Sequence, residues 1–345
     1  MKRKHDEDEE NPFKKAFNGY DDHGEYKLME LIVTDNATDV KELVLKNRNL
    51  TDNDVALLAD FQQLRMLKLG EFLSADMTNV TGSTFNMLPK SLEELLLNNM
   101  NNLTDAGIAK LHGLIKLKEL RIDAKFITGS TFNLLPKRLE GLELLGLRSL
   151  TDAGIANLQH LTELKDLIII GARSVTGSTF YLLPSSLERL WLHNMSSLTD
   201  ASIANLQHLT KLKTLLIEAR SITGSTFNLL SSSLEDLELK DMDSLTDADI
   251  ANLQHLTKLK MLTMTHNIQI AGSTFNQLPL SLEELTLDNM NHITDAGIAT
   301  LLQRLTNLRE LNIESCNLLT NRAFYSIPTN LKVTVKNCKR VREAQ

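Results

Sequence analysis

Three sets of residues in this sequence carry side chains that can act as nucleophiles, bases or ligands. The tetrapeptide GSTF occurs five times, three histidines recur at one repeat position (His160, His208 and His255), and there are two cysteines, Cys316 and Cys338. A serine nucleophile on a strand–turn–helix needs Gly-x-Ser-x-Gly, which is absent. CxxC, HExxH and the phosphate-binding P-loop are absent as well.

A group that returns in every unit of a repeating chain is better explained by packing than by catalysis. We therefore interpret the GSTF residues and the three histidines as scaffold. We interpret the two cysteines as small core residues, which suits a reducing compartment. The sequence predicts a protein that is not an enzyme, with no catalytic residue, no cofactor and no metal site.

Internal repetition determines the expected fold. LTDAGIANLQHL at 150–161 returns as LTDASIANLQHL at 198–209 and LTDADIANLQHL at 245–256, and a second motif, TGSTFNLLPKRLEGLEL, begins at Thr128 between two such copies. The unit is therefore half of the ~47-residue step, 22–25 residues, in two alternating types. Both types contain LxxLxL, which predicts thirteen strands centred on Leu43, Leu67, Leu95, Leu120, Leu142, Leu167, Leu190, Leu215, Leu237, Leu262, Leu285, Leu311 and Val333.

This pattern resembles the leucine-rich repeat family over roughly residues 40–341. The first type resembles the cysteine-containing repeats of F-box-associated proteins, and the second, LPxSLxxLxL, resembles repeats of bacterial effectors. The resemblance implies an α/β fold: a right-handed leucine-rich-repeat solenoid (horseshoe) of about 13 repeats. Its parallel β-sheet lies on the concave face, with short helices and turns on the convex face. Each unit buries its leucines only by stacking on its neighbours.

Local motifs predict how each return segment is built. In the first type, Thr or Asp of the TD pair is expected to cap a short helix such as 153–160. In the second type, Ser and Thr of GSTF are expected to cap a shorter turn, which a proline such as Pro184 ends in four of the five copies. A buried column should follow the strands, formed by Met100, Leu147, Met195, Met242, Met290, Cys316 and Cys338.

The chain divides into three predicted regions. Residues 1–24 form a charge-rich tail that we expect to be mobile. Residues 25–39 form a capping segment, with a helix near 25–34 that covers the first repeat. Residues 40–345 form the leucine-rich-repeat domain, with a C-terminal cap at about 331–345.

Strand alternation sends three columns of side chains to the concave face. On strands five to eight these columns expose an apolar cluster with the chain's only tryptophan, which is typical of an interaction hot spot. Two other interpretations of the same residues remain. The cluster could pack against a second copy of the chain, or it could be a set of scattered aliphatic residues that a flat sheet face tolerates without any function. The predicted partner-binding residues are Leu145, Ile168, Ile170, Arg189, Trp191, His193, Leu216 and Glu218.

Charge narrows the class of partner. The chain has 37 basic and 44 acidic residues, a net charge of −7, which argues against nucleic acid. The concave columns contain more acidic than basic residues, which favours a protein partner with a basic surface. No run approaches the ~18 apolar residues of a membrane span, and no apolar signal region follows the N-terminus. We expect a cytoplasmic protein, monomeric, that binds another protein.

The strict double repeat and the missing signal peptide resemble effectors that intracellular bacteria deliver through a Dot/Icm-type type IV secretion system. That resemblance implies release into the host cell cytosol without a Sec signal, and a host protein as partner. A eukaryotic or viral repeat protein would fit the same residues. The alternative function is a substrate-recognition adaptor of a ubiquitin ligase complex.

Overall fold

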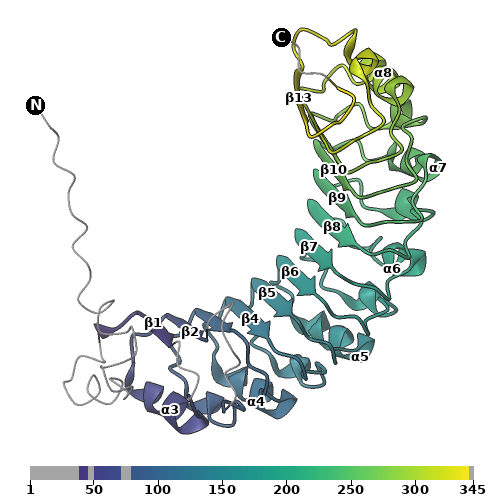
Figure 1. Cartoon of the computed structure of the whole chain (residues 1–345). Helices are drawn as coiled ribbons and strands as arrows, with labels where there is room; N and C mark the ends of the chain where they lie inside the picture. Colours follow the sequence, from purple (N-terminus) through teal and green to yellow (C-terminus); the bar gives the residue numbers. More distant parts are fainter. Residues whose placement is uncertain (1–38, 46–49, 71–78, 342–345) are drawn as a thin grey trace, which may run out of the picture. The chain divides into compact units, whose positions relative to one another are not determined.

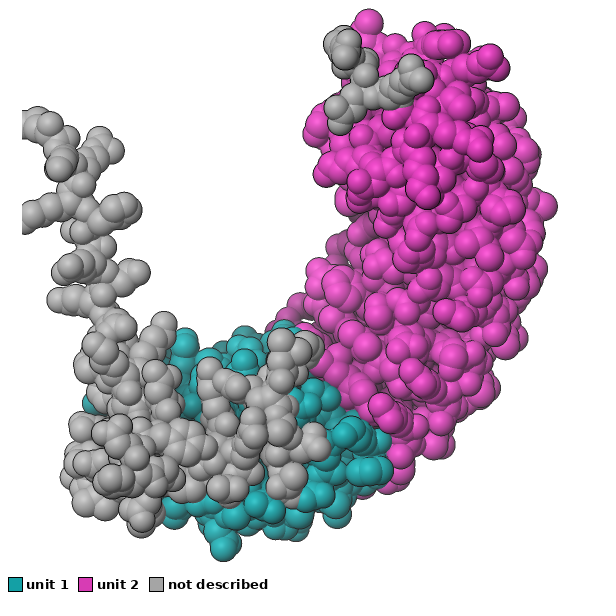
Figure 2. Space-filling view, viewed as in Figure 1, with its two compact units in different colours: residues 1–127, 134–139 teal, residues 128–133, 140–345 magenta. Residues whose placement is uncertain are grey.

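The computed structural model describes residues 39–45, 50–70 and 79–341. The predicted tail (1–24), nearly all of the predicted capping segment (25–39) and the last four residues lie outside them. The chain forms two compact units (Figure 2): residues 1–127 with 134–139, and residues 128–133 with 140–345. We call these unit 1 and unit 2 and treat each separately.

Both units are built from parallel strands that pair in the order of the sequence. The described residues of unit 1 form four strands, β1 (Glu42–Leu45), β2 (Met66–Leu69), β3 (Glu94–Leu97) and β4 (Glu119–Asp123). Unit 2 contains nine: β5 (Gly141–Leu145), β6 (Asp166–Ile170), β7 (Arg189–His193), β8 (Thr214–Glu218), β9 (Asp236–Lys240), β10 (Met261–Thr265), β11 (Glu284–Asp288), β12 (Glu310–Glu314) and β13 (Lys332–Lys336). Every predicted central residue falls on its strand, so the strand prediction is confirmed.

Short helices connect the strands, as predicted. The first-type repeats have an α-helix: α3 (Asp52–Ala56), α4 (Asp105–Ala109), α5 (Asp152–Ala156), α6 (Asp200–Ala204), α7 (Asp247–Ile250) and α8 (Asp295–Arg304). The 3₁₀ turns are η2 (Leu57–Asp60), η3 (Phe85–Met87), η4 (Lys110–Gly113), η5 (Phe132–Leu134), η6 (Asn157–His160), η7 (Phe180–Leu182), η8 (Phe227–Leu229), η9 (Ala251–Leu253), η10 (Phe275–Gln277) and η11 (Asn321–Phe324). Within unit 2, α5 to α8 lie on the convex side and the sheet lies on the concave side (Figure 1).

The core lies between the strands and the return segments of each repeat. The leucines of LxxLxL are buried, and the phenylalanine of every GSTF copy is fully buried. Burying one such phenylalanine contributes roughly 1.5–3 kcal/mol, and the contribution recurs in each pair of repeats. The predicted buried column is confirmed, including Cys316 and Cys338.

Threonine, rather than the following aspartate, caps the first-type helices α3, α4, α5 and α8. The hydroxyl of Thr151 accepts the N–H of Gly154 at 3.1 Å. The neighbouring Asp152 instead reaches the next repeat, where its carboxylate accepts the N–H of Thr176 at 3.1 Å and the N–H of Gly177 at 2.8 Å. Asp152 therefore ties two successive repeats together, which the motif alone did not indicate.

The expected GSTF cap is wrong. The Thr179 hydroxyl caps no turn; it donates to the backbone carbonyl of Asp152 at 2.7 Å. The same bond joins Thr84 to Asp52 and Thr226 to Asp200. The hydroxyl therefore joins the GSTF turn to the first residue of the preceding repeat's helix instead of capping its own turn. No helix among the described residues is long and apolar enough to cross a bilayer.

Candidate functional site

The predicted contact residues lie together on the concave sheet face of unit 2. In the middle column, Trp191 on β7 lies in register between Ile168 on β6 and Leu216 on β8. In the column nearer the strand ends, Ile170 lies in register between Leu145 and His193. We call the exposed surface formed by Ile168, Ile170 and Trp191 the Trp191 patch.

Two of the predicted contact residues are not exposed. Leu145 is 8% and Leu216 is 6% accessible, so the expectation that they contribute open surface is wrong. Leu216 is covered because its in-register neighbours, Trp191 and Glu238, have longer side chains. Both leucines lie in the same columns as the patch but are buried, and the accessible apolar area belongs to the half-buried Ile168, Ile170 and Trp191.

Charged pairs frame the patch on two sides. Arg189 donates through Nη1 to Asp166 at 3.1 Å, at the start of the strands. His193 Nε2 lies 2.7 Å from the Glu218 carboxylate, at their end. The predicted polar members of the site, Arg189, His193 and Glu218, therefore hold one another or a neighbour in place around the apolar surface.

Two polar atoms of the patch strand have no hydrogen-bond partner among the described residues. The Trp191 indole Nε1 and the His193 Nδ1 are both buried and unpaired. A buried polar group without a partner costs about 1–3 kcal/mol. Both atoms lie on β7, one of them on the half-buried Trp191, so this strand contributes two unpaired buried polar atoms to the described sheet face of unit 2.

An acidic surface adjoins the patch along β9 to β12. Its carboxylates are those of Asp236, Glu238, Glu284, Asp288, Glu310 and Glu314, against one lysine in the same columns, Lys240. Burial raises the pKa of Asp236, and the charges of Glu238 and Glu284 raise it further. A cationic group placed here would relieve that repulsion.

The residues considered for chemistry have structural surroundings. Burial raises the pKa of the Cys316 thiol to about 12, and burial raises the pKa of Cys338 as well, so neither thiol ionises readily at neutral pH. His208 and His255 contact backbone carbonyl oxygens through both ring nitrogens, at 2.8–3.1 Å. Over the described residues, no group of three or more His, Cys, Asp or Glu side chains is arranged to hold a metal ion.

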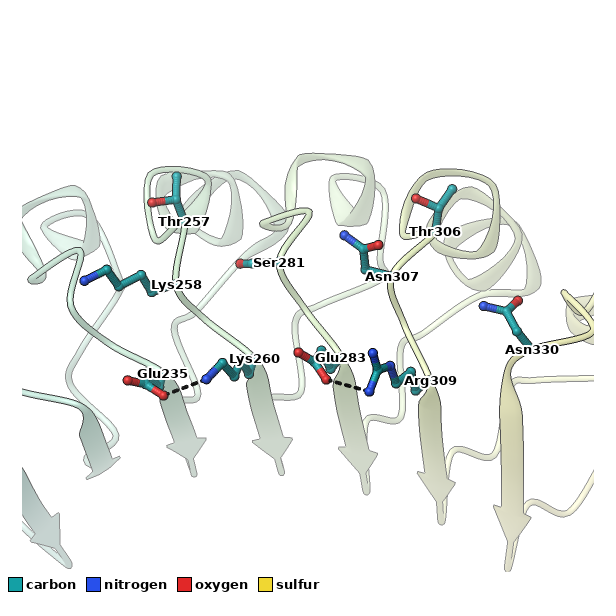
Figure 3. A pocket seen from close by; sticks show the side chains of 10 residues that line it. All are labelled: Glu235, Thr257, Lys258, Lys260, Ser281, Glu283, Thr306, Asn307, Arg309 and Asn330. Atoms are coloured by element: carbon teal, nitrogen blue, oxygen red, sulfur yellow. Dashed lines mark hydrogen bonds and ion pairs between the residues drawn. The ribbon is translucent and has the colours of Figure 1, made fainter.

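Sequence reasoning missed a ladder of alternating charge. The residue two before each central leucine is basic in one repeat type and acidic in the other, from Arg65 and Glu93 to Glu283 and Arg309. In unit 2 the successive pairs lie 2.6–3.4 Å apart, and two of them line a polar groove of about 600 Å3 (Figure 3). The pairs are exposed, so each contributes little to stability.

Comparison with known proteins identifies the fold. No protein-family model matches the sequence, and no curated protein matches it. Among solved structures, a chain of the yeast Rad7 and Elc1 complex is similar, at 21% identity and a TM-score of 0.51, over 86% of this chain and 74% of that one. An internalin, InlF of Listeria monocytogenes, is similar at 18% identity and a TM-score of 0.56, over 97% and 98%.

The fold is a leucine-rich-repeat solenoid. In each unit, the parallel strands and the alternating short helices of the described residues agree with the expected class. At these sequence identities the comparisons establish the fold alone, so the function is argued from the geometry of the site.

Proposed function

We propose that this leucine-rich-repeat chain is a non-catalytic protein-interaction module that binds a partner protein on the Trp191 patch. The observation that carries the proposal is the Trp191 side chain itself, a half-buried indole whose N–H has no acceptor among the described residues. Tryptophan is the residue type most enriched at the centres of protein interfaces, where apolar area and one donor act together. A bound partner could supply an acceptor for this N–H after a small rotation of the ring. The hydrogen bond that is missing in the free chain would then form in the complex.

The charges define the partner further. Its apolar side chain would rest on Ile168, Ile170 and Trp191, and its basic groups would face the carboxylates that begin at Asp236. Complementary charge of this kind chiefly raises the association rate and selects the partner, whereas the apolar contact limits dissociation. We therefore propose a protein with a basic surface next to an exposed apolar anchor.

The finer proposal is that the module is a bacterial effector that acts as a monomer on a host protein in the host cytosol, after Dot/Icm-type delivery. Its support is the strict alternation of the two repeat types. A second candidate is a substrate-recognition adaptor of a ubiquitin ligase complex. The first repeat type supports this candidate, and so does the similarity to Rad7, which was crystallised in complex with Elc1.

A capture experiment with two matched variants tests the proposal. The native chain, Trp191→Ala and Tyr181→Ala would be immobilised and exposed to host-cell lysate. Tyr181 is an exposed aromatic residue on η7, away from the sheet face, so its variant controls for the loss of any aromatic ring. Each captured protein would be purified and titrated against all three chains.

We expect one protein whose Kd rises about 30-fold or more in Trp191→Ala, as for a hot spot of about 2 kcal/mol, and stays unchanged in Tyr181→Ala. Capture of ligase subunits that survives Trp191→Ala would favour the adaptor. Concentration-dependent association of the chain with itself, abolished by Trp191→Ala, would replace the partner by a second copy. If every captured protein binds Trp191→Ala as tightly as the native chain, the patch is not the site.

A further inference from the structure

A hollow of about 330 Å3 lies beside the Trp191 patch, where the loops after β6 to β9 leave the sheet. It shares Glu218 with the frame of the patch but is otherwise formed by residues that the sequence analysis did not select. The lining residues are Arg173, Asn194, Met195, Ser196, Glu218, Ala219, Arg220 and Asp241.

The uncommitted side chains of this hollow are hydrogen-bond donors. Arg173, Asn194 and Ser196 are exposed, and their side chains make no hydrogen bond or ion pair with any described residue. Arg220 makes one long contact, 3.9 Å from Nε to Asp243, and its side chain is 78% exposed. Two guanidinium groups, one amide and one hydroxyl are therefore available at the rim and floor.

The two carboxylates of the hollow each have a histidine partner. Glu218 is held by His193 at 2.7 Å, and Asp241 is held by Nδ1 of His266 at 3.2 Å. With both imidazoles neutral, the formal charges of the two arginines and the two carboxylates cancel. Recognition here therefore depends on directed hydrogen bonds from free donors rather than on a strong net field.

We infer that this hollow is a binding site for an oxyanion, a carboxylate or a phosphoryl group presented by the partner. Guanidinium groups offer planar, paired N–H donors that match both groups, and Asn194 and Ser196 lie on the loop between the two arginine-bearing loops. The inference extends the proposed function, because Glu218 and His193 join the hollow to the patch. An acidic or phosphorylated side chain close to the apolar anchor would then lock the partner's position.

The two arginines of this hollow belong to a tripeptide that the sequence repeats. The tripeptide Ala-Arg-Ser occurs at 172–174 and again at 219–221, in two successive first-type repeats, whereas the equivalent loop after β10 has Ile268 in place of arginine. The spacing of two repeats, about 10 Å along the sheet, lies within the joint reach of two arginine side chains.

The test uses the arginine Nε–Hε signals in the NMR spectrum of the full chain, titrated to millimolar concentrations. One arm adds N-acetyl-glutamate amide, a second adds N-acetyl-phosphoserine amide, and a chloride series matches the ionic strength. Loss of one signal in Arg173→Gln and of another in Arg220→Gln assigns the two reporters. Arg148, exposed in the loop after β5 and outside the hollow, is the internal control.

We expect the Arg173 and Arg220 signals to shift saturably with one shared Kd for at least one of the two compounds, while Arg148 follows the chloride baseline. In Arg220→Gln the Kd reported by Arg173 should rise at least tenfold, and Ser196→Ala should raise it without changing the charge. The inference is overturned if no arginine signal saturates, if Arg148 responds like the others, or if the variants bind as the native chain does. Because no protein partner is present, a negative result leaves the Trp191 patch untouched, and failure of Trp191→Ala to affect capture leaves the hollow untouched.

Discussion

Gly154, on α5, lies where the backbone of the preceding repeat leaves no room for a side chain. A Cβ at this position would lie 2.2 Å from the carbonyl oxygen of Thr128 and 3.0 Å from the Cα of Gly129. Both obstacles are backbone atoms, so Gly154→Ala forces α5 away from its neighbour by about 1 Å. The same movement stretches the bond from the Thr151 N–H to the Thr128 carbonyl, which is 3.3 Å long in the native chain.

Helix propensity and close packing predict opposite changes in stability for Gly154→Ala, so the sign of the measured change decides between them. Helix propensity alone predicts that alanine stabilises this helix by up to about 1 kcal/mol. Overpacking costs about 1–3 kcal/mol and the weakened hydrogen bond about 0.5–1.5 kcal/mol, so after the gain in propensity we expect a net loss of roughly 0.5–4.5 kcal/mol in the free energy of unfolding. Urea unfolding followed by the fluorescence of Trp191, the only tryptophan, measures it.

Ser202 provides the matched control, because it occupies the same position in the next first-type repeat and already carries a Cβ. Its hydroxyl donates to the Thr176 carbonyl at 2.6 Å and accepts the Thr199 N–H at 2.8 Å. Ser202→Ala should therefore cost only those bonds, about 1–2 kcal/mol, with no steric component. A Gly154→Ala chain that is as stable as the native one, or more stable, would refute the argument that close backbone approach sets this repeat spacing.

Three further outcomes follow from the titratable groups. Asp236→Asn should raise the urea midpoint at neutral pH. Burial and the nearby carboxylates raise the pKa of Asp236 in the folded chain, so the folded state binds this proton more tightly than the unfolded state does. Stability therefore falls as the pH rises from the unfolded-state pKa through the folded-state pKa, and asparagine removes that loss. Cys316 and Cys338 should react with an aromatic disulfide reagent at pH 8 only after unfolding, because burial raises the pKa of both thiols. Glu188→Gln should leave the urea midpoint nearly unchanged although the hydrogen bond from Lys213 lowers the Glu188 pKa, since solvent reaches both side chains and screens the pair.

The strands could be predicted because each depends on a short pattern that the chain repeats. LxxLxL places alternate leucines on one side of a strand, and thirteen copies fixed thirteen central residues from Leu43 to Val333. The buried column that ends at Cys338 followed from the same periodicity. Local pattern and global stacking agree in every repeat, which is the condition under which sequence reasoning succeeds.

The surface could be predicted only in part, because periodicity gives the direction of a side chain and not the size of its neighbours. Alternation correctly put Leu216 on the concave face, yet Trp191 and Glu238 on the adjoining strands bury it. Contacts between repeats could not be predicted for a related reason. Asp152 accepts a hydrogen bond from the N–H of Gly177, 25 residues later, and nothing in the motif distinguishes that bond from a local helix cap. The arginine-lined hollow likewise depends on how four loops converge.

Folding does not account for the residues on β7. Thr263, Thr286 and Thr334 occupy the same column as Trp191, and a short hydroxyl-bearing side chain meets every demand of that position on a solvated sheet face. Trp191 instead buries an unpaired N–H, and His193 beside it leaves Nδ1 unpaired. In a chain whose stability comes from repeated leucines, this departure brings the fold no evident benefit, which is why we propose that Trp191 contacts another molecule.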